Sequence, residues 1–289
     1  MNDKMKNLWV RSVSGAVLVV VVLGAILWSK WSFAALLMAI LLGGEWEFYR
    51  MAQKAGYAPQ KVLGFVAGAI ILIVAFILMW LLDDSTTVSS QYLIIAVGLA
   101  LYIMMLIPVM FICELYRKSP TPIANIGSTL MGIVYVAMPL ALLFFIPLLL
   151  GRGVWNPWAL IFYIFIIWAN DVCAYLVGMS IGKHRLFQRI SPKKSWEGFF
   201  GGLAGAVATG LAAAYALDAN YWVWGGLALV ASLSGVAGDL VESMFKREAG
   251  VKDSGQVIPG HGGVLDRFDA LLLSAPYVFL YLLLVGRFV

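Results

Sequence analysis

Two carboxylates lie deep inside long apolar segments, and they are the residues of this sequence best suited to chemistry. Asp171, which follows Asn170, lies about 15 Å from the nearer polar end of its segment at helical rise, and Asp239 lies about 12 Å from the end of its own. A carboxylate at that depth in a bilayer costs at least about 2.5 kcal/mol, so each is expected to face a wet cavity or a cation. The alternative for each is a hydrogen bond that packs two helices.

Further polar or small side chains recur around both carboxylates at three- and four-residue spacing, as they would along one face of a helix. The face that carries Asp239 also holds Glu242, Ser243, Lys246 and Arg247. The face that carries Asp171 also holds Tyr175, Gly178 and Gly182, and the glycines would let another helix or a ligand approach closely. Both segments therefore present a polar face where a membrane helix is normally apolar.

Two polar loops follow these segments. The first, GKHRLFQRISPKKSWEG (182–198), is rich in basic side chains, and the second is REAGVKDSGQVIPGHGGVLDRFD (247–269). A loop as long as the second is usually functional, and its glycines allow backbone amides to approach phosphate oxygens. Basic and acidic side chains around a Gly-rich loop predict a site for a metal and a polyphosphate.

The second loop ends with Asp266, Arg267 and Asp269 at the start of the last apolar segment. Asp266 and Asp269 are three residues apart, so at the start of a helix both can face one cavity. Together with Asp239 they would offer the oxygen ligands that Mg²⁺ prefers.

The segments that position these residues are those of a membrane protein. Of the 289 residues, 62% are hydrophobic and only 12% are charged, whereas a soluble domain has about a quarter charged residues. No polar stretch is long enough for a separate soluble domain. We therefore expect one integral membrane domain over residues 1–289, in which 1–150 are mainly scaffold and 155–289 carry the catalytic spans and loops. The two cysteines support neither a disulfide framework nor a thiolate metal site.

The apolar segments predict an all-α polytopic fold of about nine transmembrane helices, with an active-site cavity at the cytoplasmic side. The expected helices are 10–28, 31–52, 61–82, 91–113, 122–149, 155–181, 197–217, 221–247 and 267–288. The first two are separated by so short a gap that a re-entrant pair is the alternative there. Pro139 and Pro147 predict a kink or a tilt in the fifth.

The distribution of Lys and Arg predicts the orientation. With the N-terminus in the cytoplasm, Lys30, Arg152 and Arg287 are the basic residues on the far side, which leaves 17 of the 20 inside. Positive charge marks cytoplasmic loops. The net charge of +5 thus reflects topology together with an anionic ligand, and it gives no argument for nucleic-acid binding.

The first half of the chain is expected to be chemically quiet. Glu45 and Glu47 lie in the segment EWEFYR, where Trp46, Tyr49 and Arg50 are typical of an anchor at the membrane interface. A structural role is the prediction there.

The polar motifs of the second half resemble those of the phosphatidate cytidylyltransferase family. The resemblance rests on Ser243-Met-Phe-Lys246-Arg247, then Lys252-Asp253, then Pro259-Gly-His261-Gly-Gly-Val-Leu-Asp266-Arg267-Phe-Asp269. The blocks from Asp171 to Gly182 and from Ser191 to Gly198 resemble the family as well. It covers roughly the last 130 residues strongly, and the earlier part matches only as hydrophobic spans.

The resemblance implies Mg²⁺-dependent transfer from CTP to phosphatidate, giving CDP-diacylglycerol and pyrophosphate for phospholipid biosynthesis, on the cytoplasmic side of a bacterial inner membrane. It also implies a homodimer, and K⁺ as a candidate second cation. Asp239, Asp266 and Asp269 would hold the metal, and Asp171 would hold a second cation or organise a lysine. The residues expected to neutralise phosphates are Lys193, Lys194, Lys246, Arg247 and Arg267. His261, Gly262 and Gly263 would contact the pyrophosphate end, and Ser195, Ser243 and Lys252 complete the expected substrate-binding set.

Three alternatives remain. A CTP-dependent polyprenol or phytol kinase and a CDP-archaeol synthase use a related membrane scaffold, but the motif around His261 favours the phosphatidate enzyme. A cation-coupled transporter would also bury Asp171 and Asp239. The absence of an inverted repeat and the gathering of polar residues on one side argue against transport.

Overall fold

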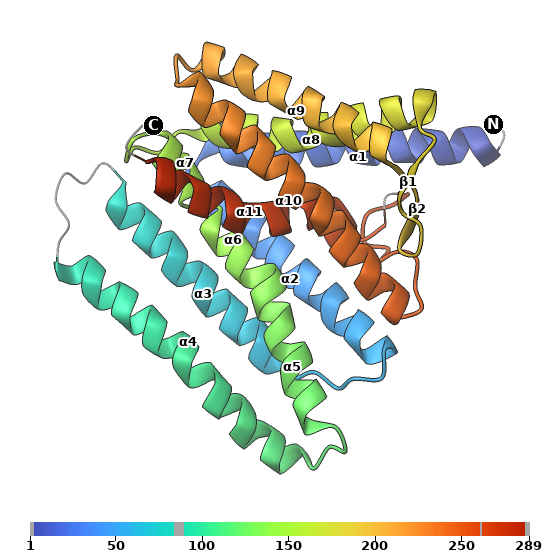
Figure 1. Ribbon diagram of the computed structural model, residues 1–289. Helices are drawn as coiled ribbons and strands as arrows, with labels where there is room; N and C mark the ends of the chain where they lie inside the picture. Colours follow the sequence, from blue (N-terminus) through green and yellow to red (C-terminus); the bar gives the residue numbers. More distant parts are fainter. Residues whose placement is uncertain (1–2, 84–89, 261, 287–289) are drawn as a thin grey trace. The chain divides into compact units, whose positions relative to one another are not determined.

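Helices form most of the chain in the computed structural model, which describes residues 3–83, 90–260 and 262–286 (Figure 1). Within these residues, nine segments are long and apolar enough to cross a membrane. The predicted all-α, multi-span membrane protein is confirmed, and most predicted limits lie within a few residues of the observed ends. The described residues group into two compact units, Met1–Phe144 with Glu248–Arg267 and Phe145–Arg247 with Phe268–Val289. The predicted single domain with a scaffold part and a catalytic part stays a prediction.

The first unit is built from long helices and one bent span. Its helices are α1 (Asp3–Trp28), α2 (Lys30–Lys54), α3 (Lys61–Leu82), α4 (Ser90–Arg117), α5 (Pro122–Gly132), η1 (Ile133–Ala137) and α6 (Met138–Leu142). A single residue separates α1 from α2. Ser29 has an extended backbone there, and its hydroxyl accepts a hydrogen bond from the Ser32 amide (3.0 Å), which caps the start of α2. α3 packs against both α2 and α4 (Figure 1).

The fifth predicted span is not a regular helix. After α5 the backbone widens into the π-helical turn η1, and the helix then ends at Leu142 before a new one, α7 (Ile146–Leu150), begins. Pro139 has no amide hydrogen to donate to the preceding turn, and Pro147 opens the next helix. The span for which a kink or a tilt was predicted is therefore interrupted at residues 143–145, between the two prolines.

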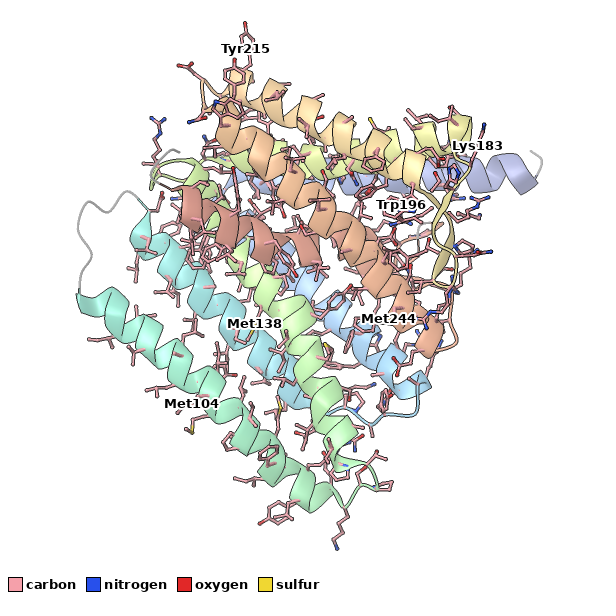
Figure 2. All side chains as sticks on the ribbon, in the orientation of Figure 1. Met104, Met138, Lys183, Trp196, Tyr215 and Met244 are labelled. Carbon is pink, nitrogen blue, oxygen red and sulfur yellow. The ribbon has the colours of Figure 1, made fainter. Side chains whose placement is uncertain are left out.

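The second unit contains the long helices that carry Asp171 and Asp239. After α7 it holds α8 (Pro157–Ile181), β1 (Arg185–Phe187), β2 (Ser191–Ser195), α9 (Trp196–Ala216), α10 (Tyr221–Glu248) and most of α11 (Leu265–Val285). Its labelled side chains show the direction of α9, with Trp196 at one end and Tyr215 at the other (Figure 2).

Close packing of α8 on α9 positions one wall of the site. A methyl group at Gly198 would lie 2.7 Å from the Ala174 carbonyl oxygen, and one at Gly202 would lie 2.7 Å from that of Asn170. Gly178 faces Gly198 across the same contact, as the sequence predicted for a glycine on the face of Asp171. Small residues thus allow the two backbones to touch.

The basic loop between α8 and α9 folds into a structure that the sequence did not predict. Residues 185–187 and 191–195 pair as a two-stranded antiparallel hairpin. The Glu197 carboxylate accepts hydrogen bonds from the backbone amides of Lys183 (3.1 Å) and His184 (3.2 Å), and it lies 2.6 Å from His184 Nδ1. Ser195 then caps α9 by accepting from the Gly198 amide (3.2 Å). These bonds hold the hairpin at the start of α9.

Candidate active site

A cavity of about 610 Å³ lies among α8, the hairpin, α9 and α10 of the second unit. Its walls carry acidic, basic and amide side chains, namely Asn170, Asp171, Arg185, Lys193, Lys194 and Asp239. Tyr175 and Gly178 line it from the same face of α8 as Asp171, as predicted from their spacing. The deep carboxylates Asp171 and Asp239 therefore face a cavity, which is the first of the two readings that the sequence left open.

Opposite charges meet directly in this cavity. Lys194 Nζ lies 2.5 Å from Asp239 Oδ2, and the two side chains are 26% and 39% exposed. Ser243, one turn further along α10, has its hydroxyl 3.4 Å from Asp239 Oδ1. Asn170 Nδ2 lies 3.4 Å from Asp171 Oδ1 on the facing helix. The cavity thus holds two carboxylates and a partly exposed lysine. A phosphate group can replace a carboxylate as the partner of the lysine, and a cation can replace the lysine as the partner of a carboxylate.

Three carboxylates gather where α10 and α11 pack together. One oxygen each from Asp239, Glu242 and Asp269 lies within 4.8 Å of the others. The approach depends on Gly238, where a methyl group would lie 2.5 Å from the Asp269 carbonyl oxygen. Lys246 Nζ donates to Glu242 Oε2 at 2.5 Å, so the buried Glu242 has a cation beside it. This donor set is oxygen only, and it fits a divalent cation such as Mg²⁺.

The Gly-rich loop belongs to the first unit, and hydrogen bonds to two carboxylates order it. Asp266 Oδ2 accepts from the amides of Ser254 (3.0 Å) and Gly263 (2.8 Å). Gly262 has φ +88, a conformation that favours glycine, and its carbonyl accepts from the Ile258 amide at 3.0 Å. The second carboxylate is Glu47 of α2, to which Val264 and Leu265 donate their amides (2.9 Å each). Of the loop glycines, Gly263 thus already donates its amide to an acceptor, Asp266 Oδ2.

The structure brings together many of the predicted site residues and leaves others apart. In the second unit it gathers Asp171, Lys193, Lys194, Ser195, Asp239, Ser243, Lys246 and Asp269 at the cavity and the carboxylate group. Arg247 lies in the last turn of α10, and its side chain is exposed. Lys252, Gly262, Gly263, Asp266 and Arg267 belong to the first unit, where Lys252 and Arg267 are exposed. His261 lies outside the described residues.

Two carboxylates have contacts at the candidate site or at the Gly-rich loop that the sequence did not predict. Glu242 was recognised on the face of Asp239 but not as a ligand, although its three-residue spacing was the available signal. Glu47 was predicted to have a structural role, beside an interfacial anchor of Trp46, Tyr49 and Arg50, and it is 1% exposed and bonded to the loop. The anchor interpretation is wrong for Tyr49, which is fully buried and donates to the Thr129 carbonyl at 3.1 Å.

Comparisons with known proteins agree, over nearly the whole chain for the family model and one relative and over less than half of it for two others. Residues 9–285 match the cytidylyltransferase family. A phosphatidate cytidylyltransferase of Synechocystis sp. is 30% identical over 302 residues, covering 95% of this chain and 96% of that protein. A phosphatidate cytidylyltransferase of Staphylococcus aureus is 51% identical over 113 residues, covering 38% of this chain and 44% of that protein. One of Staphylococcus epidermidis is 45% identical over 119 residues, covering 40% and 46%.

Proposed function

The chain belongs to the cytidylyltransferase family, and on that premise we propose that it transfers the cytidylyl group of CTP to phosphatidate. The products are CDP-diacylglycerol and pyrophosphate. The observation that carries the proposal is the cavity of the second unit, in which the cationic Arg185, Lys193 and Lys194 stand beside Asp171 and Asp239. Such a cavity suits phosphate groups on the end of a lipid whose tails stay in the bilayer.

The reaction asks little covalent chemistry of the protein. An oxygen of the phosphatidate phosphate attacks the α-phosphorus of CTP, and the bond from that phosphorus to its bridging oxygen breaks. Pyrophosphate leaves in line with the attacking oxygen and takes the electron pair of the broken bond. The attacking phosphate monoester is already an anion at pH 7, so no strong general base is required. The barrier is the meeting of two polyanions, which calls for positioning and charge neutralisation.

The cations of the cavity supply that neutralisation in the proposal. Lys194 is held by Asp239 at 2.5 Å, so its ammonium group is already oriented toward the cavity before a phosphate binds. Lys193 and Arg185 line the same cavity from the hairpin, and Arg185 can bind a phosphate through two parallel hydrogen bonds. Asp171 balances this positive charge from α8.

Asp239, Glu242 and Asp269 would hold Mg²⁺, which when bound would offset the charge of the phosphates. Support comes from their oxygen-only donor set and their mutual approach within 4.8 Å. Asp266 stays a predicted ligand on the motif alone, and K⁺ as a second cation rests on the resemblance alone. The same holds for His261 and the loop glycines as contacts of pyrophosphate.

The proposed setting is a bacterial inner membrane, with the N-terminus and the cavity facing the cytoplasm. The strong bias of Lys and Arg to one side of the spans supports this orientation. CTP is a cytoplasmic solute, so the cavity must open to that side. A homodimer is carried over from the family resemblance.

Purified protein in detergent with CTP, phosphatidate and MgCl₂ tests the proposal. CTP labelled at the α-phosphorus should give labelled CDP-diacylglycerol, EDTA should stop the reaction, and added Mg²⁺ should restore it. Label that moves instead from the γ-phosphorus of CTP to a polyprenol or phytol would identify a kinase. Absence of labelled CDP-diacylglycerol with active Mg²⁺ and lipid present would refute the proposal.

A further inference from the structure

The loop between α10 and α11 is fastened to a carboxylate of α2, a helix from the opposite end of the sequence. Glu47 is 1% exposed. Its Oε1 accepts from the Val264 amide at 2.9 Å, and its Oε2 accepts from the Leu265 amide and lies near the Ser254 hydroxyl, both at 2.9 Å. All three partners lie in the loop or at the first residue of α11. Glu47 therefore caps α11 from another helix, where the helix dipole favours a negative charge.

Ser254 joins this carboxylate to Asp266. Its hydroxyl oxygen lies 2.9 Å from Glu47 Oε2 and 2.9 Å from Asp266 Oδ2, and its amide donates to the same Asp266 oxygen. The hydroxyl oxygen lies within hydrogen-bond distance of both carboxylates and has a single proton to donate. A displacement of Glu47 would therefore also change the hydrogen bonding of Asp266, a residue of the family motif.

The packing around Glu47 leaves no space for larger residues. A methyl group at Gly255 or at Gly263 would collide with the Glu47 carboxylate. On α2 itself, a methyl group at Gly43 would lie 2.9 Å from the Val264 side chain, and one at Gly44 would lie 3.3 Å from that of Leu265. Glycines on both sides thus bring the loop backbone and the helix into direct contact.

We propose that Glu47 is a positioning residue for cytidylyl transfer, which acts by fixing the backbone of Val264 and Leu265 and, through Ser254, the orientation of Asp266. The inference rests on the role given to this loop in the proposed function. It differs from simple helix packing because, within the part of the chain that the structure describes, the hydrogen bonds of the carboxylate go to the loop or to the start of α11. The first half of the chain is then part of the catalytic apparatus.

Glu47→Gln tests the proposal because the amide keeps the size of the side chain but places an NH₂ group against one of the donors. At least one backbone amide loses its acceptor in either orientation of the Gln side chain. We expect kcat/KM to fall roughly 10- to 100-fold, as for a misplacement of reacting groups by about 1 Å. Hydrogen exchange at the amides of Val264 and Leu265 should accelerate, and the loss of kcat/KM should exceed any loss of folded protein at the assay temperature.

Glu45→Gln is the matched control on the same helix. Glu45 is fully buried, and among the described residues neither of its oxygens accepts a hydrogen bond. Its replacement should leave kcat/KM and loop exchange at wild-type values. Equal losses in both variants, or a loss in Glu47→Gln that only follows the fraction of unfolded protein, would overturn the proposal.

Ser254→Ala keeps the proposal testable if Glu47→Gln does not fold. It should lower kcat/KM and speed loop exchange without a large change in melting temperature. In the double variant the losses should not multiply, because both changes break the same connection. Independent, multiplicative losses would contradict the proposed route to Asp266. Exchange rates are measured without turnover, so they report on the loop even if the wild-type protein fails the CDP-diacylglycerol assay.

Discussion

Replacement of Asp239 by Asn should remove most of the turnover while leaving the protein folded. The two side chains have nearly the same shape, so the packing of α10 is kept. What changes is charge, because one carboxylate disappears from the group with Glu242 and Asp269 and the partner of Lys194 becomes neutral. The variant therefore separates the chemistry of this position from its contribution to the fold.

The structure gives different magnitudes for these two effects. The ion pair with Lys194 is open to water on both sides, at 26% and 39% exposure, and such a pair contributes about 0–1 kcal/mol to stability. Loss of one preorganised electrostatic contact to the reacting groups typically lowers kcat by about 10²- to 10³-fold, or roughly 3–4 kcal/mol of barrier. The expected loss of rate thus exceeds the expected loss of stability severalfold.

The assay is steady-state CDP-diacylglycerol formation at saturating Mg²⁺, with thermal unfolding measured on the same preparations. Asp218→Asn is the control, because Asp218 lies in the turn between α9 and α10 and its φ of 48 is one that Asn readily adopts. It should keep the wild-type rate. If Asp239→Asn retained more than about a tenth of wild-type kcat/KM, or if the control fell equally far, the assignment of Asp239 would be refuted.

Two further substitutions follow from the packing. Gly255→Ala should lower kcat/KM at least about tenfold, because its methyl group would collide with the Glu47 carboxylate, whereas Gly24→Ala, which meets open space, should be neutral in the same assay. A neutral Gly255→Ala would show that the loop can shift without consequence. Ser195→Ala should cost about 1 kcal/mol of stability by removing the cap of α9, measured as a lower midpoint of chemical unfolding; an unchanged midpoint would show that the bond to the Gly198 amide contributes nothing.

Much of the fold could be predicted because each membrane helix is recognisable from a local run of apolar residues. Runs of apolar residues between charged and Pro-rich breaks predicted the spans, and Pro139 and Pro147 predicted the bend in the fifth. The hairpin at 185–195 was missed because its basic, Pro-containing sequence lacks the alternation of a buried strand. The two strands instead pair next to the hydrogen bonds that the Glu197 carboxylate accepts at the start of α9.

The candidate site was predictable where its residues share one helix or one motif. Asp239, Ser243 and Lys246 follow helical spacing, and Asp171 was singled out by its depth in an apolar segment. The partnership of Glu47 with Val264 was not accessible, because no local pattern relates residues 217 positions apart. Glu45 and Glu47 look alike in sequence, and only the structure separates a buried carboxylate with three partners from its neighbour.

The distance in sequence between Glu47 and its partners has a consequence for how the protein is made. At about 5–20 residues per second, the ribosome needs roughly 10–40 s to add the 217 residues that separate Glu47 from Val264. During that interval α2 enters the membrane with a carboxylate whose donors have not yet been synthesised. The loop can therefore be ordered by Glu47 only after Val264 has been synthesised, and a nascent chain that stops before Ser254 holds Glu47 without any of these three donors.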